Sequence, residues 1–206
     1  MKSSNFYASF SAGALLHQES IVLAELYLSG DSGNWLAVRD QVKAENMLQK
    51  RTVSTLQRTA REVVTRLKCL SDLELRFLIE TSHQEQAYLL WVAMCRRYQF
   101  VADFAVEVLR ERYITLKADL HHEDFDVFFN RKSEWHTELE GIAPTTRGKL
   151  RRVLFRALRE ADFLDANYMI NPAFMSSGLV ALLAKGSGRD LFFFPVFESD
   201  LRRMMP

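Results

Sequence analysis

Apolar residues recur at three- and four-residue spacing along most of the chain, and capping residues stand before many of these stretches. This spacing is typical of amphipathic α-helices. Ser71 with Glu74, and Ser82 with Glu85, match the capping box that begins a helix. The pattern predicts helices over these approximate ranges: 11–28, 34–44, 52–70, 71–81, 83–98, 101–114, 123–130, 133–140, 145–161 and 177–185.

The pattern weakens after Phe163. The segment "FLDANYMINPAFMS" suits a short extended piece, and the Pro-interrupted "LFFFPVF" predicts a packed extended strap, not a central strand. The chain has only 8 Gly and 4 Pro, so turns are few and elements are long. We therefore expect an all-α, compact globular bundle of helices that is more than half helical. We expect one domain over 1–206, divisible into 1–70, 71–132 and 133–206.

Composition points to a buried helical core. Hydrophobic residues make up 48% of the sequence. The core is expected to include Trp35, Trp91, Trp135 and the two cysteines, Cys69 and Cys95. The longest apolar run, residues 87–95, is far shorter than the about 20 residues of a membrane span. The N-terminal residues lack the apolar region of a signal peptide, so a cytoplasmic protein with no membrane contact is expected.

The net charge of +1 combines two basic segments with an acidic one between them. Residues 39–68 hold eight Lys or Arg and three Asp or Glu, and residues 144–160 hold six and one. Residues 71–143 hold eight basic and fourteen acidic residues. The positive charge is therefore concentrated in two places.

Both basic segments contain an amphipathic helix whose cations lie opposite its apolar face, at about 100° per residue. The predicted buried face of the first helix is Val53, Leu56, Ala60, Val63, Val64 and Leu67. Its predicted polar face is Arg51, Ser54, Arg58, Arg61, Thr65 and Arg66. The predicted buried face of the second helix is Leu150, Val153, Leu154, Ala157 and Ala161. Within the two helices only Glu62 and Glu160 are acidic.

Long Arg side chains with nearby hydroxyls and free helix N-terminal amides suit contacts to phosphates. We therefore predict binding of double-stranded DNA. The predicted DNA-binding residues are Lys50, Arg51, Ser54, Arg58, Arg61, Thr145, Thr146, Arg147, Lys149, Arg152, Arg156 and Arg159. The alternative is that these faces are merely solvated.

Each basic helix also follows another predicted helix after a break, as in a helix-turn-helix. Residues 133–140, "GIAP" and the helix from Thr145 form the pair with the short turn. Residues 34–44 and the helix from Thr52 form the other pair, with a longer connection. The sequence thus predicts two helix-turn-helix-like basic elements.

Signals for catalysis or cofactor binding are weak. The chain has no GxxxxGK[ST], GxGxxG, HExxH or GxSxG motif. In "HHEDFD", His121 and His122 would point about 100° apart on a helix, which disfavours a shared metal ion. We therefore expect no enzyme activity, no metal, no cofactor and no small-molecule substrate.

Four long segments resemble the BrxA proteins of bacterial BREX (bacteriophage exclusion) systems. They are "FSAGALLHQESIVLAELYL", "AENMLQKRTVSTLQRTAREVVTRL", "QEQAYLLWVAMCRRYQFVADFAVEVLRE" and "KSEWHTELEGIAPTTRGKLRRVLFRALREADFL". The resemblance spans roughly residues 6–183, and residues from Gly186 onward lie outside it.

The resemblance implies an all-helical, cytosolic, non-catalytic protein. It implies a place in a phage-defence operon beside a DNA methyltransferase, an ATPase and a phosphatase-like protein, with other BREX proteins as partners. It also implies binding of double-stranded DNA through helix-turn-helix elements, in agreement with the two basic helices. Two alternatives stay open: an adaptor that docks its basic helices on acidic proteins, and an RNA-binding helical protein.

Overall fold

The structure is a computed structural model that describes residues 10–30, 34–186 and 188–204. Of these residues 69% are helical, and no strand occurs among them. Two isolated β-bridges join Asp119 to Met169 and Leu164 to Ile170. The all-α prediction is confirmed.

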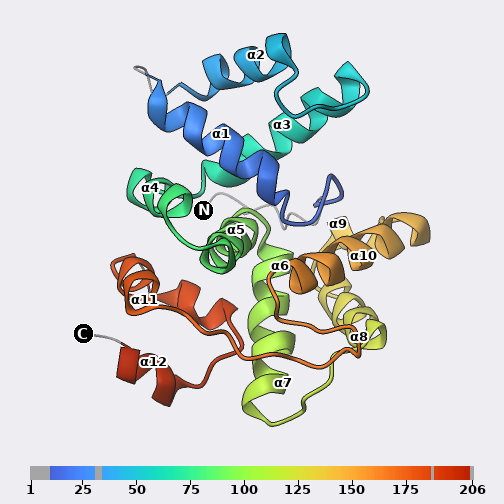
Figure 1. The fold of residues 1–206 in the computed structure, drawn as a ribbon. Helices are drawn as coiled ribbons and strands as arrows, with labels where there is room; N and C mark the ends of the chain where they lie inside the picture. Colours follow the sequence, from blue (N-terminus) through green and yellow to red (C-terminus); the bar gives the residue numbers. More distant parts are fainter. Residues whose placement is uncertain (1–9, 31–33, 187, 205–206) are drawn as a thin grey trace. The chain divides into compact units, whose positions relative to one another are not determined.

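Most helices follow one another with short connections, whereas the longer segment 161–176 joins α10 to α11 (Figure 1). Their bounds are α1 His17–Ser29, α2 Trp35–Glu45, α3 Val53–Leu67, α4 Asp72–Glu80, α5 His83–Arg97, α6 Gln99–Phe104, the π-helical η1 Ala105–Arg110, α7 Glu111–Ile114, α8 His122–Ser133, α9 Thr137–Glu140, α10 Pro144–Glu160, α11 Ser177–Ala184, the 3-10 helix η2 Arg189–Phe193 and α12 Glu198–Met204.

Contacts divide the chain into two compact units, whose boundary lies between α5 and α6. One unit comprises residues 12–97, and the other comprises residues 98–204 together with Phe10 and Ser11. The sequence placed its possible subdivisions after residues 70 and 132 instead. Whether the chain behaves as a single domain stays a prediction.

In the unit of residues 12–97, α3 packs against α1, α2 and α5, and α5 also contacts α1 and α4 (Figure 1). Residues 87–95 of α5 are all buried, so this apolar run is a core helix as predicted. Three predicted caps are confirmed: Asn34 caps α2, Thr52 caps α3, and Ser71 with Glu74 forms a capping box on α4. At the second predicted box, the Glu85 amide donates to the Ser82 hydroxyl at 3.4 Å.

Three expectations for this unit are wrong. The first helix does not begin at Ser11, because Leu16 adopts a left-handed conformation (φ 54°) and α1 begins at His17. Val53 is 61% exposed, because it is the first residue of α3. Arg66, placed on the polar face, is only 3% exposed because its guanidinium bonds the carbonyl oxygens of Gly13 and Ala14.

In the second unit, α6, η1 and α7 form one continuous helical stretch from Gln99 to Ile114. A cluster of phenylalanine rings joins this stretch to α8, with the Phe100 and Phe128 centroids 5.1 Å apart. Phe104 also packs edge-on against Phe128, at 5.3 Å. α10 packs its own apolar face inward, and its Phe155 ring lies 4.5 Å from that of His122 on α8.

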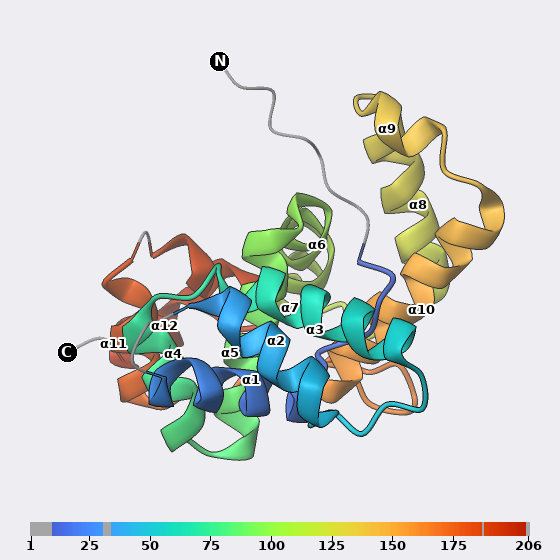
Figure 2. The ribbon, with the colours of Figure 1, turned by 90° about the horizontal axis from the view of Figure 1, so that it is seen from above.

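The helix predicted over 133–140 is wrong. Ser133 ends α8 and donates a hydrogen bond back to the carbonyl of Asn130, at 2.7 Å. Only the single turn α9 follows, at one end of α8 (Figure 2). Trp135 lies in the connection and is 82% exposed, so it is not a core residue. Trp91 is fully buried as predicted, and Trp35 stacks on Tyr27 with ring centroids 4.0 Å apart.

The C-terminal segment packs on the π-helical turn. Arg110 of η1 is 9% exposed, lies 3.6 Å from the Glu198 carboxylate and stacks over the Phe192 ring at 4.9 Å. The strap predicted in "LFFFPVF" is confirmed in part. Its first residues belong to η2, whereas residues 194–196 are buried and Phe194 is extended.

Candidate nucleic-acid interface

The exposed face of α3 carries the first set of predicted DNA-binding residues. Arg51, Ser54, Arg58 and Arg61 are all exposed, while Leu56 lies on the buried face of the same helix. Within the described part of the chain, none of the three arginine side chains makes a hydrogen bond or an ion pair. Their guanidinium groups are therefore available to an external anion.

Lys50 stands apart from this set. Its Nζ atom lies 2.6 Å from the Glu19 carboxylate, and its side chain is only 28% exposed. The pair ties the connection between α2 and α3 to α1. A phosphate would have to compete with Glu19 for Lys50, so this residue is a weaker candidate than its neighbour Arg51.

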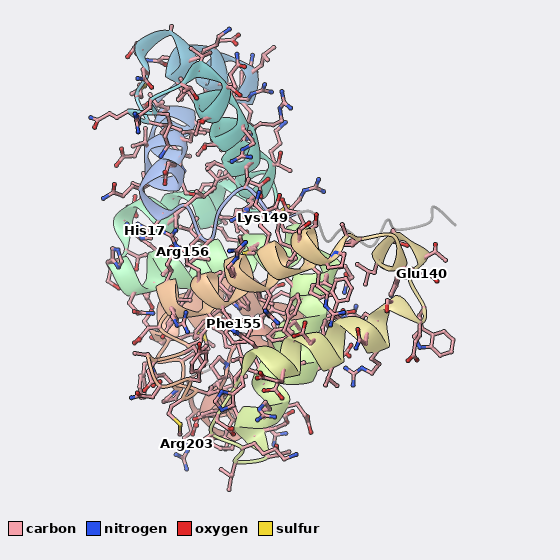
Figure 3. All side chains as sticks on the ribbon, turned by 90° about the vertical axis from the view of Figure 1, so that its right-hand side faces the viewer. His17, Glu140, Lys149, Phe155, Arg156 and Arg203 are labelled. Carbon is pink, nitrogen blue, oxygen red and sulfur yellow. The ribbon has the colours of Figure 1, made fainter. Side chains whose placement is uncertain are left out.

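The N-terminal half of α10 carries the second set. Thr145 and Thr146 are exposed in the first turn, after Pro144 at the first helical position. Arg152 is exposed and Lys149 is half-buried. In the described residues, neither of these two cations has a hydrogen-bond or ion-pair partner. In Figure 3, Lys149 and Arg156 are labelled on the side of α10 away from Phe155.

Arg147 is bound within the protein. It donates to the Asp126 carboxylate at 3.0 Å and to the Asn130 side-chain oxygen at 2.7 Å, and it stacks over the Phe129 ring at 4.6 Å. Arg151 pairs with the same Asp126 carboxylate. Arg147 thus joins α10 to α8, and its geometry indicates a structural role.

Arg156 and Arg159 lie further along α10, and both are exposed. Arg156 pairs with Glu160 at 2.7 Å, but its side chain is 75% exposed, so this ion pair lies in solvent and is weak. The Arg159 guanidinium stacks over the ring of Tyr168 at 5.1 Å. This contact holds the side chain in place without neutralising its charge.

The N-termini of α3 and α10 lack acidic residues, as do those of α2, α6 and α11. Neither helix has Asp or Glu in its first turn, whereas α4 and α8 each have two. Acidic residues there stabilise a helix because its N-terminus carries partial positive charge. α10 also lacks a side-chain cap. Both helix starts therefore favour an external anion.

The "HHEDFD" segment forms local contacts instead. Asp124 accepts a hydrogen bond from the His121 amide at 2.8 Å and another from Arg112 at 3.0 Å. Burial, with the nearby positive charge of Arg151, lowers the pKa of His122. In the residues that the structure describes, no group of three or more His, Cys, Asp or Glu could hold a metal ion.

Across the described ranges, no helix is both long and apolar enough to span a bilayer.

The family follows from the match to known sequences. The sequence model of the BrxA family matches residues 4–187, a span that contains both basic helices. The chain belongs to the BrxA family. "BREX protein BrxA" of Escherichia coli O9:H4 (strain HS) is 30% identical over 154 residues, which cover 74% of this chain and 71% of that one. "BREX protein BrxA" of Bacillus cereus (strain H3081.97) is 26% identical over 127 residues, or 62% and 64% of the two chains.

A solved structure shares the BrxA-family fold seen here. It is the crystal structure of an uncharacterized protein from Magnetospirillum magneticum, with a TM-score of 0.79 and 20% identity. The similarity covers 92% of this chain and 97% of that one. The identity is low, so the comparison supports the fold alone.

The sequence did not reveal the internal partners that neutralise some of the predicted DNA-binding cations of this BrxA-family chain. Glu19 binds Lys50 across 31 residues and Asp126 binds Arg147 across 21 residues, distances at which helical spacing carries no signal. It also missed Tyr168, which lies in the loop after α10 and stacks on Arg159.

Proposed function

We propose that this BrxA-family protein is a non-catalytic accessory protein of a BREX phage-defence system that binds double-stranded DNA through α3 and α10. The observation that carries the proposal is a set of cations, on or just before the two helices, whose side chains have no internal partner among the described residues. They are the exposed Arg51, Arg58, Arg61 and Arg152 and the half-buried Lys149. Like charges on one helix face repel one another, and a bound polyanion would relieve this repulsion.

The packing around α3 supports a helix-turn-helix role for α2 and α3. α3 is the second helix of the pair, packs on α1 and α2, and carries exposed cations on its outer face. The connection, residues 46–52, is longer than the usual three or four residues. α3 is therefore proposed to contact DNA mainly through phosphates.

The second element is proposed with a different first helix. Because α9 is a single turn, α8 is the substantial helix before α10, and Arg147 joins the two. α10 would present Lys149, Arg152, Arg156 and Arg159 to the DNA backbone. Binding of this kind falls steeply with salt and varies little with sequence.

The name of the curated relatives supports other BREX proteins as partners. An adaptor that docks on an acidic protein, and an RNA-binding protein, would use the same cations. Competition separates these functions. A labelled short duplex is bound by the protein, and unlabelled duplex, RNA or heparin is added at equal phosphate or sulfate concentration.

The proposal expects unlabelled duplex of unrelated sequence to displace the label best. Displacement by structured RNA at much lower concentration would favour RNA binding instead. An absence of duplex binding at low salt, with heparin still bound, would favour the adaptor. Arg76→Glu, an exposed change on α4, is the control for general loss of positive charge.

A further inference from the structure

A pocket of about 200 Å³ lies between α2 and α3. Buried Leu56 and Ala60 of α3 contribute to its lining, and Gln57 of the same helix adds a side-chain amide. A water molecule's share of liquid volume is about 30 Å³, so the pocket has room for a small polyatomic ion. It is smaller than the roughly 300–1,000 Å³ of sites that enclose drug-sized ligands.

Three cations surround this pocket. Arg39 and Lys43 are four residues apart and therefore share one face of α2, and Arg61 comes from α3. Of the residues that the structure describes, none pairs with or hydrogen bonds to any of these three side chains. One carboxylate, Asp40, also lines the pocket, but it forms no ion pair within 4.0 Å there.

This arrangement differs from that of the paired cations Lys132 and Arg112 in the other unit. Lys132 has two carboxylate partners, Asp103 and Glu107, and Arg112 likewise has two. The like-charged pair Arg39 and Lys43 opposes helix formation at its four-residue spacing. An unneutralised group of three cations around a small pocket indicates an anion that comes from outside the chain.

We propose that Arg39, Lys43 and Arg61 form a pocket that binds one phosphate group, with the Gln57 amide as an additional donor. The planar guanidinium groups of Arg39 and Arg61 match phosphate oxygens in pairs, and Lys43 supplies a compact charge.

The pocket extends the interface to α2, a helix that carries none of the residues predicted from the sequence. Its assignment to DNA rests on the proposed function, since Arg61 belongs both to the pocket and to the exposed face of α3. In a helix-turn-helix the first helix crosses the nucleic-acid backbone, which is where a phosphate pocket would lie. The phosphate would be a diester of the duplex backbone or a terminal monoester.

The first test uses inorganic phosphate and the full chain. The side-chain NH signals of Arg39 and Arg61 are followed by NMR as phosphate replaces chloride at constant ionic strength. The proposal expects saturable shifts at these two arginines in wild type, and loss of the Arg61 shift in Arg39→Gln/Lys43→Gln. The charge-preserving variant Arg39→Lys/Lys43→Arg should keep the saturable shift at Arg61. Equal shifts in wild type and the Gln variant, or no saturation in wild type, would overturn the pocket.

The second test identifies the source of the phosphate. Duplexes with 5′-hydroxyl or 5′-phosphate ends are titrated with wild type and the Arg39→Gln/Lys43→Gln variant over a range of salt. For a backbone phosphate, the negative slope of log affinity against log salt is shallower by about 0.9 in the variant, on both duplexes. For a terminal phosphate, wild type prefers the phosphorylated duplex, and the variant loses only that preference.

Either result supports the pocket. If the variant keeps both the salt slope and the duplex preference of wild type, the pocket does not contact DNA. Arg76→Gln, which removes an exposed cation of the same unit away from the pocket, should change neither quantity beyond the loss of general charge. If wild type binds no duplex at all, the proposed function fails, whereas the phosphate titration still decides the pocket by itself.

Discussion

Replacing Arg66 with alanine is expected to destabilise the unit of residues 12–97 far more than replacing any other arginine of α3. The Arg66 side chain is only 4% exposed. Its Nε atom donates to the Glu62 carboxylate at 2.7 Å, and its guanidinium also donates to the carbonyl oxygens of Gly13 and Ala14. Alanine leaves one carboxylate and two carbonyl oxygens without these bonds.

The magnitude follows from these lost partners. Removing one member of a buried ion pair costs about 3–5 kcal/mol, because the remaining charge stays buried and unpaired. The Glu62 side chain is 13% exposed and Gly13 is half-buried, so water reaches part of the site and the lower end of that range is expected. A loss of about 3 kcal/mol is a large share of the roughly 5–15 kcal/mol that stabilise a domain.

Urea unfolding followed by far-UV circular dichroism and tryptophan fluorescence measures this loss. Trp91, fully buried in α5, reports on the same unit, and a Trp135→Phe background removes the exposed tryptophan of the other unit. Arg58→Ala, on the exposed face of α3, is the matched control and should change the unfolding free energy by less than about 0.5 kcal/mol.

The double variant Glu62→Ala/Arg66→Ala should regain part of the stability, because the carboxylate that lost Arg66 is removed as well. If Arg66→Ala unfolded within about 1 kcal/mol of wild type, the buried network would contribute little and this reasoning would be refuted.

Three further predictions concern the pH dependence of stability, the effect of a chelator, and the different roles of two arginines on α10. Burial alone would raise the pKa of Glu74, but hydrogen bonds from Arg96 and the Ser71 amide lower it. The stability that Glu74 contributes is therefore present above its unfolded pKa of about 4.3 and is lost as pH falls through the lower folded pKa. In Glu74→Gln the melting temperature should change less with pH in that acid range. A pH dependence equal to that of wild type would contradict this. A chelator should leave the melting temperature unchanged, whereas a drop of several degrees that zinc restores would show a metal site. Arg147→Gln should lower stability with little effect on DNA affinity, and Arg152→Gln should do the reverse; the opposite pattern in melting and binding assays would show that their roles are exchanged.

Local signals predicted much of the fold. The capping box of Ser71 and Glu74 involves residues three apart, and Asn34 and Thr52 cap their helices through the amides just ahead. Such signals are complete within one turn of chain, so helix starts could be found from the sequence. The apolar run at residues 87–95 likewise predicted a buried helix because its length excluded a membrane span.

Features that depend on distant residues could not be predicted. Arg66 lies on the polar side of α3 by helical angle, but carbonyl oxygens more than fifty residues earlier hold it in the interior. The same segment leads into Leu16, whose left-handed conformation sets the start of α1. Trp135 is exposed because α8 continues to Ser133 and leaves the tryptophan in the following connection.

In the candidate site, too, local features could be predicted and features set by distant residues could not. Amphipathic spacing was sufficient to place Arg58, Arg61 and Arg152 on exposed faces, since it depends only on the helix itself. Which cations are already bound inside the protein depends on tertiary contacts, as for Lys50 and Arg147. The proposed phosphate pocket could not be predicted from the sequence, because its three cations come from two helices and meet only in the folded protein.

The most direct measurement of the central claim is the salt dependence of duplex binding by wild type and by charge-reversed α10. Arg152, Arg156 and Arg159 are changed to Glu together, and folding is checked by circular dichroism. Wild type is expected to bind duplexes of unrelated sequence with similar affinity, and the affinity should fall steeply with salt. The variant should bind all of them more weakly, and the negative slope of log affinity against log salt should be shallower by roughly 2.7 for three lost phosphate contacts. A folded variant with the affinity and salt slope of wild type would contradict DNA binding by this helix.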